Sequence, residues 1–203
     1  MSTQNRLGRN PYARTSGRLA HWCWLFVVLS LLQAAALQAD EAGDLKVVDV
    51  HAWARGDVRL LDANFAIRLS SGAREALDNG VPLTFELQIQ LVKKHRWLWD
   101  VVEAEHVLVR ELEYHALTRS YLVKDVTSVS QGNYSRLDDA LVAAGSIEKL
   151  LFTSVPLEPD HNYSIRLRGN LDIEALPTPV RLLAYVSSGW DMSSDWYAWP
   201  LDR

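Results

Sequence analysis

The chain has 203 residues, of which 48% are hydrophobic and 23% charged, and its formal net charge is −4. All 25 acidic residues lie after position 39, together with 17 of the 21 basic ones, so residues 40–203 carry a net charge of −8. Such an acidic segment lacks the basic stripe that supplies most nucleic-acid affinity, which argues against a nucleic-acid partner. Its length suffices for one domain with its own core.

The first 39 residues have the pattern of an export signal. Four arginines precede an apolar run from Trp22 to Leu37, and small residues follow it. Spanning hydrocarbon takes roughly 20 apolar residues, so this shorter run, interrupted by Gln33, favours a cleavable signal peptide. We expect cleavage after Ala39 and a mature chain that starts near Asp40. The alternative is an uncleaved signal anchor whose arginine-rich end stays cytoplasmic.

Both alternatives make residues 40–203 a single exported domain. The only cysteine, Cys23, lies in the apolar run, where it is expected to be an ordinary small apolar residue. The exported domain therefore contains no thiol, and its stability must come from its core.

The exported domain begins with three predicted strands and one helix. Leu45–Trp53 is the first strand, and Leu61–Leu69 follows with apolar residues at alternate positions. A short helix is expected between Ser70 and Gly80, because the serine pair at its start can cap it and the glycine can end it. In Val81–Val92 apolar residues alternate with Thr, Glu and Gln, which predicts one buried and one wet face, as in antiparallel sheets.

The middle of the chain continues with two predicted strands, Val101–Leu117 and Arg119–Val126. The first of these carries alternate acidic residues, which are Glu103, Glu105, Glu111 and Glu113. They are expected to form a solvated acidic face. A second short helix is predicted after Ser135, because apolar residues then recur three and four apart. These residues are Leu137, Ala140, Leu141, Ala144 and Ile147.

The last part of the chain completes the set of strands with Tyr163–Ile173, Val180–Val186 and Trp196–Leu201. Aromatic residues on both faces of the final strand suit a position within a sheet, where it would lock the core. The predicted fold class is mainly β: an antiparallel β-sandwich of about eight strands with two short helices.

Trp97 and Trp99 form a candidate partner or ligand surface together with Arg96 and Asp100. The two rings lie two residues apart at a predicted strand corner, so on an extended chain they project to the same side. An exposed aromatic pair beside cations fits a protein partner or a sugar ring. The alternative, favoured by the usual burial of large aromatic side chains, is that the pair closes one end of the sandwich.

Five short segments are distinctive as a set. They are Asn79–Leu83, the corner Arg96–Asp100, Tyr114–Thr118 with Tyr121, Leu171–Asp172 before Leu176–Pro177, and the ending Trp190–Trp199. Together they resemble a proteobacterial exported family catalogued as domain of unknown function 4390. The resemblance covers nearly the whole exported part. It implies a periplasmic protein of the Gram-negative cell envelope and hints at a membrane signalling protein as partner, but it implies no enzyme activity and no cofactor.

The chain contains no motif for a serine hydrolase, a zinc peptidase, a thiol redox centre or a phosphate-binding loop. We therefore predict no catalytic, cofactor-binding or metal-binding residue, although Asp49 and His51 share one strand face and could form a metal or acid–base pair. The expected function is a non-catalytic interaction module for an envelope or inner-membrane protein, with membrane contact only through the N-terminal segment. The alternatives are a glycan- or peptidoglycan-binding β-sandwich and, last, a hydrolase with an unrecognised site.

Overall fold

The computed structural model describes residues 42–55, 58–95, 99–153, 157–158 and 160–201. Residues 40–203 form one compact unit. Its strands are β1 (Asp44–Arg55), β2 (Val58–Arg68), β3 (Leu83–Lys94), β4 (Val101–His115), β5 (Ser120–Asp125), β6 (Ser130–Tyr134), β7 (Ser146–Thr153), β8 (Asn162–Leu171) and β9 (Tyr197–Leu201). Its helices are α2 (Ser71–Asp78), α3 (Leu137–Gly145), α4 (Thr178–Val186) and the 3-10 turn η1 (Ser188–Trp190).

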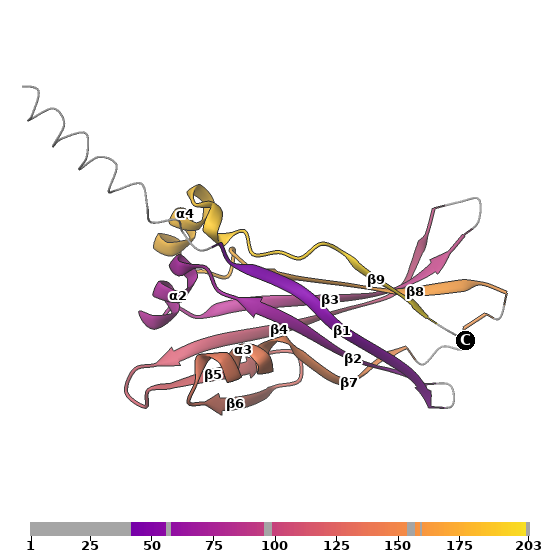
Figure 1. The fold of residues 1–203 in the computed structure, drawn as a ribbon, viewed down its shortest axis with the longest axis horizontal. Helices are drawn as coiled ribbons and strands as arrows, with labels where there is room; N and C mark the ends of the chain where they lie inside the picture. The colour runs from indigo at the N-terminus through magenta and orange to yellow at the C-terminus, as the bar shows by residue number, and fades with distance from the viewer. Residues whose placement is uncertain (1–41, 56–57, 96–98, 154–156, 159, 202–203) are drawn as a thin grey trace, which may run out of the picture. The chain divides into compact units, whose positions relative to one another are not determined.

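The strands form two sheets that are antiparallel throughout. One sheet has the order β1-β2-β7, and the other has the order β6-β5-β4-β3-β8-β9. The smaller sheet lies across the larger one, and α3 lies beside β2 and β5 (Figure 1). The predicted fold class, mainly β with a sandwich-like antiparallel arrangement, is therefore confirmed, with nine strands among the described residues.

The core lies between the facing sides of the two sheets. β3 supplies a buried apolar side chain at every second position, namely Leu83, Phe85, Leu87, Ile89 and Leu91. β2 does the same with Leu61, Ala63, Phe65 and Ile67. Each large side chain buried in this way contributes roughly 1.5–3 kcal/mol relative to an exposed one. Gly169 of β8 lies directly against the side chain of Leu45, so the missing Cβ lets β1 approach the larger sheet.

The first predicted helix is confirmed at α2. The Ser70 hydroxyl accepts a hydrogen bond from the backbone N–H of Ala73 at 3.1 Å, which caps the first turn. Gly80 has a φ of 81° and donates its N–H to the carbonyl of Leu77, so the glycine ends the helix as expected. The second helix, α3, begins after Arg136 and ends at Gly145, and Ile147 belongs to β7 instead of the helix.

Three parts of the prediction are wrong. Residues 178–186 form the helix α4 where a strand was expected, so the described chain has three α-helices instead of two. Pro179 fits the first turn of a helix, where its missing N–H is not needed, and the carbonyl of Pro177 accepts hydrogen bonds from Val180 and Arg181. β6 and β7 were not predicted, since the polar sequence of β6 has no apolar alternation and β7 directly continues α3.

The long strands give the domain two distinct ends (Figure 1). β3 begins next to α2 and runs roughly 35–40 Å to its other end, at 3.3 Å per residue. We call the end with α2 and α4 the helical end, and the end with the last residues of β3, β7 and β9 the tip end. The starts of β4 and β8 also lie at the tip end, because Lys93 pairs with both Val101 and Tyr163.

Candidate functional site

Trp99 lies at the tip end, just before β4 begins, and 84% of its surface is exposed. The neighbouring Val101 and Val102 at the start of β4 are also exposed. The alternative of an aromatic plug is therefore wrong for Trp99, whose ring faces solvent. Arg96 and Trp97 lie outside the described residues, as do Ala39 and Asp40 of the expected cleavage site.

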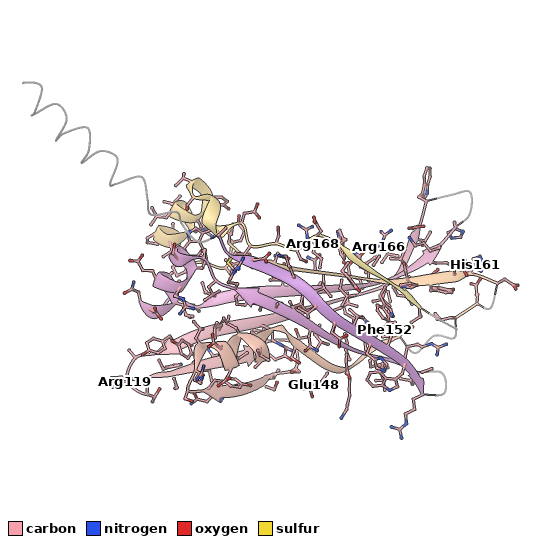
Figure 2. All side chains as sticks on the ribbon, viewed as in Figure 1. Arg119, Glu148, Phe152, His161, Arg166 and Arg168 are labelled. Carbon is pink, nitrogen blue, oxygen red and sulfur yellow. The ribbon has the colours of Figure 1, made fainter. Side chains whose placement is uncertain are left out.

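Asp100, the residue that follows this exposed tryptophan, is held in place by two cationic side chains. Its carboxylate accepts hydrogen bonds from Lys94 Nζ and from an Arg166 guanidinium nitrogen, each at 2.7 Å. Lys94 belongs to β3, Asp100 directly precedes β4, and Arg166 belongs to β8, where Figure 2 labels it. The hydrogen bond from Lys94, aided by the Arg166 cation, holds the pKa of Asp100 below its ordinary value although partial burial opposes ionisation. The backbone next to Trp99 is therefore fixed, through Asp100, to the neighbouring strands β3 and β8.

Lys93 forms a second ion pair at the tip end. It follows Leu91 in the inward-facing series of β3, and its side chain is only 11% exposed. Its ammonium lies 2.9 Å from the carboxylate of Glu158, which also lies 3.0 Å from His161 Nδ1. The hydrogen bond to Glu158 raises the pKa of Lys93, and the same bond lowers the pKa of Glu158. A buried cation needs such a partner, so this pair attaches the segment before β8 to the sandwich.

A polar cavity of about 530 Å³ lies beside these ion pairs. It is lined by Lys94, His95, Asp160, His161 and Asn162. The rings of His95 and His161 meet edge to face, with centroids 5.7 Å apart. The lining offers both hydrogen-bond donors and acceptors, which suits a polar organic ligand. Among the described residues, no group of three or more His, Cys, Asp or Glu side chains could hold a metal ion.

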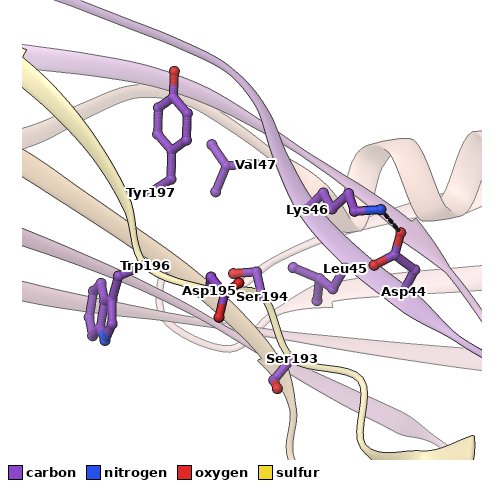
Figure 3. Close-up of a pocket in the computed structure, with 9 residues that line it drawn as sticks. All are labelled: Asp44, Leu45, Lys46, Val47, Ser193, Ser194, Asp195, Trp196 and Tyr197. Atoms are coloured by element: carbon purple, nitrogen blue, oxygen red, sulfur yellow. Dashed lines mark ion pairs between the residues drawn. The ribbon is translucent and has the colours of Figure 1, made fainter.

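A second hollow of about 280 Å³ lies between β1 and the segment before β9 (Figure 3). It is lined by residues 44–47 and 193–197. β1 has a register irregularity between Val47 and Asp49, and Val48 at that point is exposed. Trp196 and Tyr197 project to opposite sides of the chain (Figure 3). Irregular edge strands resist the addition of a further strand, so this hollow is an unfavourable place for β-strand addition.

The final strand is confirmed from Tyr197 onward, but its expected position is wrong. β9 pairs only with β8, so it forms an edge of the larger sheet and does not lie within it. Trp199 is opposite the buried Ile165 and is half-buried against the core, whereas Trp196 remains exposed.

Glu105, Glu111 and Glu113 of β4 share one face of the sheet, as predicted, whereas Glu103 lies at a register irregularity opposite Leu91 and Val92. Lys124 of β5 lies 2.7 Å from Glu111 and 2.9 Å from Glu113, and these two hydrogen bonds raise the pKa of the lysine. Glu105 accepts a hydrogen bond from Gln90. Each of the carboxylates of Glu105, Glu111 and Glu113 therefore already has a partner on this surface.

The histidines take separate places. Asp49 and His51 are both exposed on one face of β1, as predicted, and the His51 ring stacks on Trp53 with centroids 5.6 Å apart. His106 lies on the inner face of β4 and donates a hydrogen bond to the carbonyl of Phe152 at 2.8 Å, which links the two sheets. Among the histidines of the described ranges, His95 and His161 come together at the tip-end cavity.

Comparison with known protein families gives a match over almost all of the chain after position 39. The family model described as Domain of unknown function (DUF4390) matches residues 42–200. The chain belongs to the DUF4390 family. The matched range of this DUF4390 chain contains both sheets and the tip-end ion pairs. No curated protein and no solved structure matches the DUF4390 chain.

Within the described part of the DUF4390 chain, no helix is long and apolar enough to cross a membrane. The sequence pattern did not indicate the tip-end network of Lys93, Glu158 and Arg166. The sequence did contain one signal for a buried ion pair, because Lys93 occupies the next inward position after Leu91 in an otherwise apolar series. Its partner could not be found in this way, since Glu158 is 65 positions further along the chain.

Proposed function

We propose that this DUF4390 chain is an exported, periplasmic interaction module that binds an envelope or inner-membrane protein, as an accessory to a membrane signalling protein. The observation that carries the proposal is Trp99, 84% exposed on a base held by Asp100, Lys94 and Arg166. A large aromatic ring presented in a preorganised position is the typical anchor of a protein interface, because little conformational entropy is lost on binding.

The surroundings of Trp99 support a partner surface at the tip end. Val101 and Val102 extend the exposed apolar area, while the ion pairs of Asp100 provide a polar rim. Interfaces commonly combine an aromatic anchor with a rim of this kind. The sequence neighbours Arg96 and Trp97 belong to the same predicted surface.

The test is crosslinked pull-down from envelope fractions with mass spectrometry, using the full chain and two single variants. We expect Trp99→Ala to lower the yield of the captured partner at least tenfold, the effect of losing a hot-spot contact of about 1.4 kcal/mol or more. The matched control is Leu117→Ala, which removes a fully exposed apolar side chain at the other end of β4. If Trp99→Ala captures the same proteins at the parental yield, Trp99 is not the partner surface.

The cavity beside the ion pairs favours one further candidate, a glycan- or peptidoglycan-binding site. Polar side chains such as Asn162 and Asp160 could bind sugar hydroxyls, and a tryptophan ring could stack on the sugar. Titration of the same proteins with cell-wall fragments, followed by tryptophan fluorescence, separates the two functions. The glycan candidate requires a response at millimolar fragment that Trp99→Ala weakens, and an unchanged spectrum of the parent protein excludes it.

A further inference from the structure

Helix α4 presents an apolar surface that no other described element covers. Leu182, Leu183, Tyr185 and Val186 are exposed by between 59% and 84%, whereas Ala184 is buried against the domain. At about 100° per residue, the exposed side chains cover an arc of about 160°. No residue of α4 within that arc is charged. Arg181 lies at its border, where it donates a hydrogen bond to the carbonyl of Glu174, and the Tyr185 hydroxyl donates one to the Glu174 carboxylate at the same border.

The position of α4 is close to the place where the described chain begins. η1 follows α4 directly, and the next residues bring Met192 against Gly43. Trp190 of η1 is also in contact with Gly72 of α2. α4 and the start of β1 therefore share the helical end of the domain (Figure 1).

The length of the connecting chain limits how far this end can lie from a membrane. The apolar run ends at Leu37, and the six steps from Leu37 to Gly43 reach at most about 21 Å. If the run stays in the bilayer, the helical end is kept near the lipid surface. A large uncharged apolar arc is what a helix at that surface requires, and a tyrosine such as Tyr185 is common at the headgroup level.

We propose that α4 lies on the lipid bilayer, with its apolar arc at the boundary between headgroups and acyl chains, in the form of the protein that keeps its N-terminal run. This proposal rests on the anchored alternative of the proposed localisation and extends the membrane contact beyond the N-terminal segment. It also directs the tip end with Trp99 away from the bilayer, because β3 separates the two ends.

The charge of the domain and the length of α4 indicate that α4 binds lipid only when the N-terminal run anchors the chain in the membrane. The exported domain has a net charge of −8, so anionic lipids do not attract it, and a helix of nine residues has little surface to insert. A retained anchor raises the effective concentration of α4 at the lipid surface to a level that free diffusion would not reach. Neutral lipid should therefore bind α4 at least as well as anionic lipid.

The experiment uses the full chain, synthesised without signal peptidase into phosphatidylcholine nanodiscs. Cys23→Ala removes the only thiol, and an environment-sensitive NBD group is placed at Leu183→Cys or, as a matched control, at Leu151→Cys on β7. Both positions are exposed leucines. We expect a blue-shifted emission at position 183 and quenching by doxyl-labelled lipid at least threefold stronger than at position 151. Leu182→Ser with Val186→Ser should abolish both effects while the thermal melt stays unchanged.

The other outcomes overturn the proposal in distinguishable ways. Water-like emission at position 183 in a chain that co-elutes with the discs refutes the lipid contact alone. A chain that does not co-elute refutes the retained anchor, and with it the role of α4. A blue shift without quenching by doxyl lipid shows that α4 binds protein, either a second copy or the apolar run, instead of lipid. None of these results bears on Trp99, whose pull-down is a separate measurement.

Discussion

Arg110 and Asp125 form an ion pair on the inner face of the larger sheet, and each side chain is about one-eighth exposed. Arg110 is opposite the buried Phe85 in the ladder between β3 and β4. The Asp125 carboxylate also accepts hydrogen bonds from the backbone N–H groups of Thr127 and Ser128, at 2.9 and 3.0 Å. The Asp125 carboxylate thus fixes both the turn after β5 and the inward-facing guanidinium of Arg110.

The pH dependence of stability tests this pair. Burial opposes ionisation of Asp125, but hydrogen bonds from Ser128 and the Arg110 cation outweigh it, so the pKa lies below the ordinary 3.8. The unfolded state then binds more protons, so this stabilisation is present above pH 3.8 and is lost as pH falls through the folded pKa. We expect Asp125→Asn to lower the free energy of unfolding by about 1–3 kcal/mol at pH 7.

Urea denaturation from pH 7 down to pH 2 measures the effect. The difference between the parent and Asp125→Asn should shrink as the pH falls below 3.8, because the unfolded parent chain binds the proton at a higher pH than the folded one. Glu148→Gln, at an exposed position of β7, is the matched control and should leave the profile unchanged. Parallel profiles of the parent and Asp125→Asn would show that Asp125 contributes no ionised stabilisation.

β9 covers buried residues of β8 at the edge of the larger sheet. Trp199 and Tyr197 are opposite Ile165 and Leu167 of β8, both of which are completely buried. β9 therefore protects one border of the core although it is an edge strand. The proline at position 200 suits this edge, because a residue without an N–H cannot pair on both sides.

Removal of β9 is expected to destabilise the whole domain. A chain that ends at Asp195 should lose its cooperative thermal transition, since the border of β8 becomes exposed. Trp199→Ala should cost about 2–3 kcal/mol in chemical denaturation, less than a fully buried tryptophan because the ring is half-exposed. Trp196→Ala is the matched control, and its exposed ring should change stability by less than about 1 kcal/mol. A truncated chain that keeps its cooperative melt would contradict this role of β9.

The domain formed by residues 40–203 has two opposite ends with different surfaces. The helical end carries the chain from the N-terminal segment and exposes α4, whereas the tip end exposes Trp99. An exposed, uncharged apolar surface is typical of a contact with a membrane or with another protein. The proposed lipid contact of α4 implies a preference for the retained anchor over the cleavage expected after Ala39.

Fractionation of cells tests that preference at the level of the complete chain. We expect the protein in the membrane fraction after a carbonate wash, with peptides from residues 22–37 detected by mass spectrometry. An overexpressed soluble periplasmic protein serves as the control for the wash. A soluble protein whose N-terminus is Asp40 would show cleavage and would contradict the membrane role of α4.

The sequence alone determined those elements whose pattern is local. Alternation in β2 and β3 predicted strands and their buried faces, because the side-chain period of a strand is two residues. Ser70 and Gly80 predicted both ends of α2, because caps act on adjacent backbone groups. The distinctive segments also indicated the family that the comparison confirmed over residues 42–200.

The tertiary structure decided everything that depends on which distant residues meet. It made residues 178–186 a helix, placed β9 at an edge and left Trp99 in solvent. It also joined Lys93 to Glu158 and Arg110 to Asp125. Such pairs follow from the register of strands far apart in the chain, and no local period records that register. The fold class and the candidate residue Trp99 were therefore predictable from the sequence, while the exposure of Trp99 was not.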